Sequence, residues 1–175
     1  KAWRKWWQAL EQLLLPPQPL CGFCAEHPSL PVGACKLCLD ALPIRWEKRN
    51  LHGYSWFSLL TYQGLARELI HRLKFQDGYD VACTFGTFLG LAAREEPDLA
   101  KVDVLVPVPL GPDRFSARGF NQAKILADSM GEVWKRQICK GVIRTRDTKN
   151  QSGLSLRERE KNVQGVFAIL PGFEF

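Results

Sequence analysis

The sequence predicts an α/β protein in which a small four-cysteine module precedes a domain built on a parallel sheet. Two observations predict this arrangement. Two Cys-x-x-Cys pairs stand near the start of the chain, ten residues apart. Farther along, the apolar run 102–108 is followed by a polar loop and then by an amphipathic helix over 123–134. Strand, loop and helix in this order begin a βαβ unit, which requires a parallel sheet.

The two cysteine pairs are Cys21-x-x-Cys24 and Cys35-x-x-Cys38. Two such pairs on facing turns can close a tetrahedral shell of four thiolates around zinc, as in a zinc-ribbon-like module. This shell leaves no open position for water or substrate, so we expect the zinc to be structural. The segment 16–50 is too short to bury a self-sufficient core, and a structural zinc can supply on the order of 10 kcal/mol of folding free energy.

Disulfide pairing of the same cysteines is the alternative, and it suits secreted proteins. Residues 1–15 begin with positive charge, but Gln8, Glu11 and Gln12 interrupt their apolar character and no small-residue cleavage site follows. Because no export signal is present, we favour zinc and expect a cytoplasmic location. His27 lies between the pairs and could replace one ligand, but four cysteines satisfy the metal, so we expect this histidine to be exposed.

The first residues of the chain predict an amphipathic helix that ends before Pro16 and Pro17. We favour packing of its apolar stripe on the protein or on a partner, with a membrane surface as the alternative. The stripe consists of large apolar side chains at helical spacing: Trp3, Trp6, Trp7, Leu10, Leu13 and Leu14.

The composition is that of a globular protein, with 46% hydrophobic and 24% charged residues. No apolar run approaches the roughly 18 residues of a membrane-spanning helix, so no transmembrane segment is expected. The formal net charge of +6 is concentrated in residues 101–162, which contain 13 lysines and arginines and 7 acidic residues. A concentrated positive region indicates an anionic partner, either nucleic acid or a phosphate-bearing small molecule. A solvated basic face is the alternative.

The pattern changes after residue 50, which divides the chain into the N-terminal helix and cysteine module (1–50) and the α/β domain (51–175). Ser155 and Glu158 form a capping box that opens a short charged helix. The remaining elements expected, in chain order, are a strand or strand pair at 54–62, a helix at 65–73, a helix at 85–93, a strand covered on both faces at 102–108, an amphipathic helix at 123–134, a weaker strand at 142–145 and a stronger strand at 166–170.

The loop over 107–122, between the apolar strand and its helix, is the most informative stretch. Ligands of open parallel sheets bind beyond the carboxyl ends of the strands, where a helix also presents unpaired N–H groups. Arg114, Arg118 and Gly119 add forked donors and close backbone access, so we expect a phosphate or pyrophosphate site. The alternative is a surface loop whose arginines pair with acidic neighbours such as Asp113.

A second loop covers residues 144–155 before the capping box. It is polar, contains glycine and has no hydrophobic periodicity. Loops of this kind are mobile and often close over ligands. A loop that only connects two elements and contacts no ligand is equally compatible with the sequence.

Taken together, the motifs resemble the ComF (GntX-like) family, which joins an N-terminal zinc module to a phosphoribosyltransferase-like domain. The resemblance covers nearly the whole chain. It is carried by Pro16-Pro-Gln-Pro-Leu-Cys21-Gly-Phe-Cys24, Cys35-Lys-Leu-Cys38, Leu73-Lys-Phe75, Val106-Pro-Val-Pro-Leu110, Arg114, Arg118-Gly-Phe-Asn-Gln122, Thr148, Gln151, Leu154-Ser155, Arg159 and Asn162-Val-Gln-Gly-Val-Phe167.

The resemblance implies a type I phosphoribosyltransferase-like parallel sheet that binds phosphoribosyl pyrophosphate with Mg²⁺. It implies that 109–119 is the pyrophosphate-side loop and that 145–162 is a flexible loop that excludes water. It also implies a link to DNA uptake in natural competence or to DNA utilisation, with DNA-uptake proteins as partners. The substrate-binding residues carried over by position are Arg114, Arg118, Gly119, Asn121, Gln122, Thr148 and Gln151.

One family motif does not occur in this sequence: a strand that ends in two acidic residues before a threonine-rich loop for the ribose 5-phosphate. By the family order it would lie just beyond Phe175, so we expect a truncated domain with an incomplete sheet. The catalytic residues are therefore unknown. If the protein ends at Phe175, we expect little or no transferase activity.

Two other functions stay open at this point. In the first, the protein is a non-enzymatic accessory protein that binds single-stranded DNA through aromatic stacking and positive charge. In the second, it is a scaffold that docks a partner protein and binds neither phosphoribosyl pyrophosphate nor DNA. The candidates for DNA stacking are Trp3, Trp6, Trp7, Trp46, Trp56 and Arg49.

Overall fold

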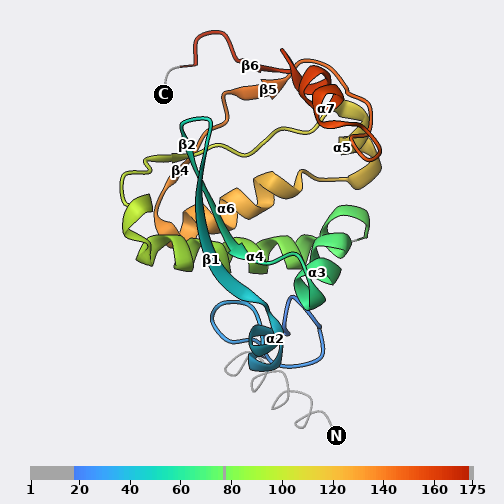
Figure 1. The fold of residues 1–175 in the computed structure, drawn as a ribbon. Coiled ribbons are helices and arrows are strands. Elements are labelled where there is room, and N and C mark those ends of the chain that lie inside the picture. Colours follow the sequence, from blue (N-terminus) through green and yellow to red (C-terminus); the bar gives the residue numbers. More distant parts are fainter. Residues whose placement is uncertain (1–17, 77, 174–175) are drawn as a thin grey trace, which may run out of the picture.

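The computed structural model describes residues 18–76 and 78–173, so the helix expected over 1–15 lies outside the described part. The described chain is an α/β structure with small sheets (Figure 1). Its helices are α2 (Lys36–Ala41), α3 (Gly64–Phe75), α4 (Tyr79–Glu95), the 3₁₀ helix η1 (Pro97–Leu99), α5 (Pro112–Arg118), α6 (Gln122–Trp134) and α7 (Leu156–Val163). Its strands are β1 (Ile44–Leu51), β2 (Tyr54–Leu60), β3 (Val104–Leu105), β4 (Gln137–Ile138), β5 (Val142–Arg144) and β6 (Phe167–Ile169).

The strand pair expected near 54–62 is confirmed as the second half of a long antiparallel hairpin, β1–β2. The pairing ends at Leu51 and Tyr54, and His52 and Gly53 make the turn with φ values of 52° and 84°. Two central residues with positive φ are typical of the type I′ turn, whose twist matches the twist of a two-stranded ribbon. The pairing is uninterrupted from Glu47 to Leu51 next to this turn, and its register shifts between Ile44 and Glu47 at the far end.

One face of the hairpin is attached to η1. Trp46 donates its indole N–H to the carboxylate of Glu96, and Lys48 forms an ion pair with Asp98. The domain boundary expected after residue 50 lies within this hairpin, and the division into domains stays a prediction.

The helices α4 and α6 lie side by side and make the most extensive contact between elements of the described chain (Figure 1). A Cβ atom placed on Gly86 would stand 2.5 Å from the carbonyl oxygen of Leu126, and one on Gly90 would stand 2.7 Å from that of Met130. The two backbones can approach closely only because these glycines carry no side chain. Both expected helices are confirmed, and α4 begins at Tyr79, earlier than the expected 85.

The hydrophobic core lies between the cysteine turns, α3 and α4. The helix expected at 65–73 is confirmed as α3, which buries Leu69 and Leu73. A single buried cluster joins these helices to the cysteines, so the small module does not depend on a core of its own. The members of the cluster are Cys21, Phe23, Ala34, Cys35, Cys38, Leu42, Ala66, Leu69, Leu73, Val81, Ala82 and Phe85.

The sheets differ from the expectation. The run 102–108 pairs only over β3, parallel to β4, and the strands β5 and β6 form a separate antiparallel pair. Val106 is 46% exposed and Val108 is 59% exposed, so this run is not covered on both faces in the described structure. A continuous apolar run indicates what can be buried, whereas actual pairing needs a neighbouring strand. The larger phosphoribosyltransferase-like sheet stays a prediction.

The loop between β3 and α6 contains the short helix α5, which the sequence analysis did not predict. Pro112 stands at its first position and Gly119 ends it with a φ of 77°. Proline at the start and a left-handed glycine at the end are the usual signals for a helix. Farther on, the capping box of α7 is confirmed, because Ser155 donates its backbone N–H to Glu158 at 2.8 Å.

Replacing Gly86 by alanine should weaken the contact between α4 and α6. The new methyl group would meet the Leu126 carbonyl at 2.5 Å, so the helices must separate. We expect Gly86→Ala to lower the free energy of unfolding by about 1–3 kcal/mol, although alanine favours helix formation. Urea denaturation measures this change. The control Glu95→Ala, at an exposed position of the same helix, should stay within about 0.5 kcal/mol. An unchanged midpoint for Gly86→Ala would contradict the packing described.

Candidate functional site

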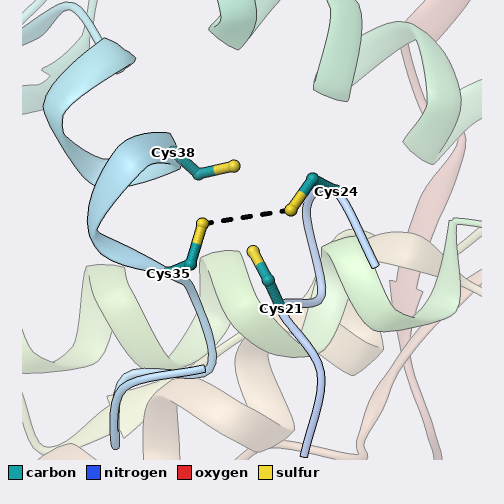
Figure 2. Close-up of side chains that lie close together, drawn as sticks. All are labelled: Cys21, Cys24, Cys35 and Cys38. Carbon is teal, nitrogen blue, oxygen red and sulfur yellow. Dashed lines mark hydrogen bonds between the residues drawn. The ribbon is translucent and has the colours of Figure 1, made fainter. Parts of the chain in front are cut away.

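The four predicted metal ligands converge on one point (Figure 2). All four sulfur atoms lie within 4.8 Å of one another, and the Sγ atoms of Cys24 and Cys35 are 3.9 Å apart. A tetrahedral zinc site with Zn–S bonds near 2.3 Å requires sulfur–sulfur distances of about 3.8 Å. The cluster therefore fits a four-thiolate zinc site, and its four cysteines carry free thiols rather than disulfides.

Tight turns bring the first cysteine pair into position. Cys21 donates its backbone N–H to the carbonyl of His27 at 2.8 Å, and Ala25 donates to the carbonyl of Cys21 at 2.7 Å. The turn before the second pair passes through Gly33 at a φ of 86°, with its N–H bonded to the Leu30 carbonyl at 2.8 Å. A left-handed backbone at this position favours glycine.

Three contacts attach the cysteine turns to the helices. The ring of Phe23 lies 4.8 Å from the ring of Phe85 on α4, and Arg72 of α3 donates to the carbonyl of Phe23. A Cβ atom on Gly22 would stand 2.1 Å from the hydroxyl oxygen of Thr84. The four-cysteine centre thus packs against α3 and α4. The folding of the cysteine turns is therefore coupled to the folding of these two helices.

The electrostatics of the cluster favour a bound cation. Hydrogen bonds from the backbone of Glu26 and the side chain of His27 lower the pKa of Cys24 to about 6. Burial, followed by hydrogen bonds with the neighbouring thiols, raises the pKa of Cys38 well above its usual range. Four adjacent thiolates repel one another, so a divalent ion is needed to hold them deprotonated together.

His27 is exposed, as expected, although its ring approaches the cluster. Its Nδ1 atom lies 3.7 Å from the sulfur of Cys24. Cys24, Glu26 and His27 also form a group whose ligand atoms lie close together. Because four buried or half-buried sulfurs already converge, the histidine is placed to hydrogen-bond a ligand sulfur rather than to replace it.

A second feature is an open groove of about 1190 Å³ between α3, α5 and the loop that follows β5. Five of the seven predicted substrate-binding residues line it: Arg114, Arg118, Gly119, Thr148 and Gln151. The groove also contains Lys74 and Phe75 from the end of α3, which the sequence analysis did not assign to the site. Leu73-Lys-Phe75 is one of the motifs that carry the family resemblance. No local sequence pattern, however, predicts that the end of α3 lies beside α5.

Arg114 joins the two predicted loops. From α5, its guanidinium group donates to the backbone carbonyls of Thr148 and Lys149 at 3.4 and 3.3 Å. Arg144 donates to the hydroxyl group of Thr148 from the other side. The loop over 144–155 is therefore attached to the arginine-bearing helix rather than extended into solvent.

The other two predicted residues support the groove without lining it. Gln122 is only 7% exposed, and its side-chain oxygen accepts a hydrogen bond from Arg118 at 3.1 Å. Asn121 caps α6 by accepting the N–H of Ala123 at 3.0 Å, and its amide group donates to the carbonyl of Val108 at 3.1 Å. In this geometry Gln122 holds the guanidinium group of Arg118, and Asn121 joins the start of α6 to Val108. Direct substrate contacts by them stay a prediction.

The groove has positive charge without matching ion pairs. Within residues 18–76 and 78–173, no carboxylate oxygen lies within 4.0 Å of the charged nitrogens of Lys74, Arg114 or Arg118. Burial lowers the pKa of Arg144, and the neighbouring positive charge of Arg114 lowers it further. Cations that line one groove without an ion-pair partner among the described residues favour an anionic ligand.

The carboxylate of Asp147 occupies the amino end of α5. It accepts the backbone N–H of Asp113 at 3.5 Å, and a Cβ atom on Gly111 would stand 1.9 Å from it. An external anion was expected at the start of the amphipathic helix that follows this loop, which is α6, and there the side chain of Asn121 accepts the N–H of Ala123. At the start of α5, a helix that was not predicted, the protein's own carboxylate occupies the amino end.

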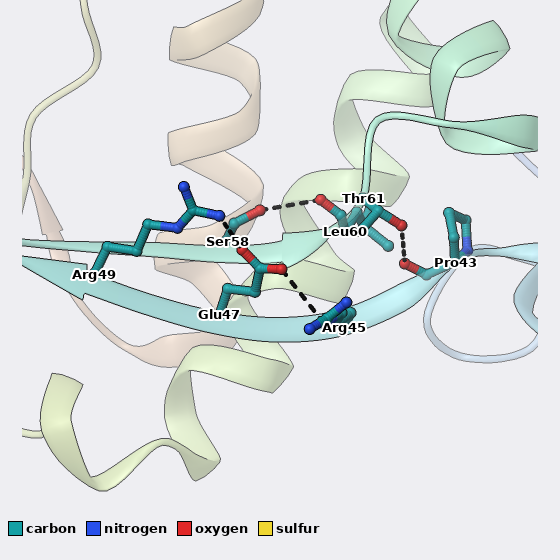
Figure 3. A network of polar contacts seen from close by, with 7 residues as sticks. All are labelled: Pro43, Arg45, Glu47, Arg49, Ser58, Leu60 and Thr61. Atoms are coloured by element: carbon teal, nitrogen blue, oxygen red, sulfur yellow. Dashed lines mark hydrogen bonds and ion pairs between the residues drawn. The ribbon is translucent and has the colours of Figure 1, made fainter.

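The outer face of the β1–β2 hairpin is a second charged surface. Arg45 and Arg49 share the carboxylate of Glu47 at 3.4 and 2.9 Å (Figure 3). Arg49 also lies over the ring of Trp56 at 5.7 Å, and Tyr54 beside the turn is 78% exposed. Arginines of β1 and exposed aromatic rings of β2 therefore occur on the same ribbon, with Arg49 and Trp56 directly opposite each other.

Fold and site together define an α/β protein with a cysteine metal module, and comparison with known proteins agrees with this class. No protein-family model matches the chain. The chain is 33% identical over 158 residues to DNA utilization protein YhgH of Salmonella typhimurium, and 28% identical over 155 residues to Competence protein F of Haemophilus influenzae. Each match covers 86% of this chain. Competence protein ComFC of Streptococcus pneumoniae is 31% identical over 107 residues, which is 61% of this chain and 46% of the relative.

These matches confirm the resemblance to the ComF (GntX-like) family: the chain is a homologue of these competence and DNA utilization proteins. It spans 63% of the length of the YhgH protein and 64% of that of Competence protein F. None of the helices in the described part combines the length and the hydrophobicity that a bilayer crossing requires.

Removal of the metal should unfold the cysteine module and destabilise the helices packed on it. We expect the purified protein to contain equimolar zinc, and Cys38→Ser to lose this zinc and lower the melting temperature. Elemental analysis and thermal unfolding measure both effects. The matched control His27→Ala should retain zinc, because four sulfurs remain. Full zinc content in Cys38→Ser, or stability unaffected by chelation, would contradict the assigned site.

Proposed function

We propose that the groove binds phosphoribosyl pyrophosphate or a related polyphosphate, together with Mg²⁺, in a protein linked to DNA uptake or DNA utilisation. The main support is that Lys74, Arg114 and Arg118 converge on one groove and have no ion-pair partner in the described structure. The names of the relatives, a DNA utilization protein and competence proteins, support the biological setting.

The groove residues suit the charge of such a ligand. Guanidinium groups present paired donors to phosphate oxygens, whereas a lysine acts as a point charge. In a phosphoribosyl transfer, Arg114 and Arg118 would balance the charge that develops on the departing pyrophosphate. Among the lining residues that the structure describes, Asp113 and Asp147 carry carboxylates. Mg²⁺, which prefers oxygen ligands, would therefore be held largely by the phosphates of the ligand.

Titration with phosphoribosyl pyrophosphate and Mg²⁺ tests this proposal. We expect Lys74→Ala and Arg118→Lys each to weaken binding, the first by loss of charge and the second by loss of the forked geometry, by roughly tenfold each. Calorimetry measures the dissociation constants. Arg157→Ala is the matched control, because Arg157 lies on α7 outside the groove. Equal affinity of the intact protein and all variants for phosphoribosyl pyrophosphate, or no binding by the intact protein, would contradict the proposal.

Binding of single-stranded DNA along the β1–β2 hairpin is a second candidate function. It is favoured by the exposed ribbon of Arg49, Trp56 and Tyr54, since bases stack on aromatic rings and phosphates bind arginine. Trp46, another expected candidate, is engaged with Glu96 instead. The expected candidates near the N-terminus lie outside the described residues.

The salt dependence of DNA binding separates this candidate from the first. We expect the affinity for an oligothymidylate to fall steeply with salt, and Trp56→Ala to weaken it by about 1–3 kcal/mol through lost stacking. Fluorescence anisotropy at several salt concentrations measures both. Tyr62→Ala, an exposed aromatic residue outside the hairpin, is the control. A flat salt response, or equal losses in both variants, would argue against the ribbon as the DNA surface.

A further inference from the structure

The turn between α5 and α6 brings together two side chains that belong to different helices. Arg118 is the last residue of α5, and Gln122 is the first residue of α6. Gly119 ends α5 in a left-handed conformation, with a φ of 77°, which favours glycine. Asn121 starts α6 by accepting the N–H of Ala123 with its side chain. The contact between the arginine and the glutamine therefore depends on this turn and not on the regular spacing of one helix.

Gln122 holds the guanidinium group of Arg118 from the side of α6. Its side-chain oxygen accepts a hydrogen bond from Nη1 of the arginine at 3.1 Å, and the glutamine is only 7% exposed. A buried amide group needs such a partner, because water cannot replace it. The bond uses one of the five N–H donors of the guanidinium group. Four donors of Arg118 therefore remain for other acceptors.

Phe75 contacts the same guanidinium group from the side of α3. The guanidinium carbon of Arg118 lies 5.9 Å from the centroid of the phenylalanine ring, which is within the range of a cation–π contact. The ring of His71, one turn earlier on α3, lies 4.9 Å from the ring of Phe75. Phe75 is 67% exposed, so its large side chain contributes little to the core. The contact with the arginine gives this exposed ring a role in the groove.

The two contacts restrict Arg118 in the absence of a ligand. A free arginine side chain has many rotamers, and a ligand that has to order it loses affinity. Here residues of α3 and α6 hold one guanidinium group, and Arg118 lines the groove together with Lys74 and Arg114. A guanidinium group that is already oriented can offer paired donors to phosphate oxygens at a smaller entropic cost.

We propose that Gln122 and Phe75 are positioning residues, which fix the orientation of Arg118 for the pyrophosphate group of the ligand. This inference rests on the proposed polyphosphate site. It gives Gln122, which the family resemblance places among the substrate-binding residues, a role that is exerted through the arginine. The burial of Gln122 and the engagement of its oxygen by Arg118 support this indirect role. The affinity for pyrophosphate then depends on both residues only while the arginine is present.

A double-mutant cycle with pyrophosphate and Mg²⁺ tests the proposal on the full chain loaded with zinc. Gln122→Met removes the acceptor and keeps the length of the side chain, so we expect calorimetry to show about tenfold weaker binding. In an Arg118→Ala background, which retains Lys74 and Arg114, the same change should alter the affinity less than about twofold. Gln63→Met is the matched control and should bind as the intact protein does, because Gln63 is exposed and does not line the groove.

Variants of the exposed ring and a measurement without ligand complete the test. Phe75→Leu should weaken pyrophosphate binding about two- to fivefold, whereas Phe75→Tyr keeps the aromatic face and should retain the affinity. NMR relaxation of the Nε–H group of Arg118 reports its mobility in the ligand-free protein. We expect Gln122→Met and Phe75→Leu to increase this mobility, and Phe75→Tyr and Gln63→Met to leave it unchanged.

An equal loss of affinity from Gln122→Met with and without Arg118 would overturn the proposal, because it would indicate a direct ligand contact or a general structural defect. So would an Arg118 side chain that is as mobile in the intact protein as in Gln122→Met. If Arg118→Ala binds too weakly for the cycle, the relaxation data decide between the same two outcomes. Pyrophosphate binding with independent effects would remove only the positioning role and leave the proposed function intact. No binding by the intact protein would remove both.

Discussion

The groove depends on a contact that leaves no room for a side chain, between the first cysteine turn and α4. Gly22 lies so close to Thr84 that a Cβ atom would collide with its hydroxyl group, and Phe23 packs on Phe85 beside it. This turn also carries Cys21 and Cys24 of the four-thiol centre. The helix α3 packs in the same buried cluster and carries Lys74 at its end, so one continuous set of contacts joins the thiol centre to the wall of the groove.

Residue patterns predicted the parts of the structure whose causes are local. The cysteine spacing is sufficient to predict a four-sulfur centre, and the periodicity of α3 and α6 and the capping box at Ser155 are also local signals. The short helix α5 could also have been predicted from the sequence, since Pro112 and Gly119 mark its two ends. It was missed because a helix of this length has too few residues to show a hydrophobic period.

The parts of the structure that the sequence did not predict depend on contacts between segments that are distant along the chain. The apolar run at 102–108 was expected to be one long buried strand, but strand length depends on a partner, and β4 supplies only two paired residues. Likewise, the sequence does not show that the ring of Phe75 meets the guanidinium group of Arg118, 43 positions farther along the chain. Nor does it show that Asp147 occupies the start of α5, a helix that was not expected. In each case the three-dimensional packing, and not the residue type, decides the role.

The attachment of Arg114 to the carbonyl groups of Thr148 and Lys149 uses only one of its three nitrogen atoms, Nη2. A guanidinium group has five N–H donors, so Nη1 and Nε keep donors for another acceptor. The segment after β5 can therefore stay attached to α5 while the same arginine meets a second acceptor. One side chain can in this way serve as a fastening for the chain and as a donor at the surface.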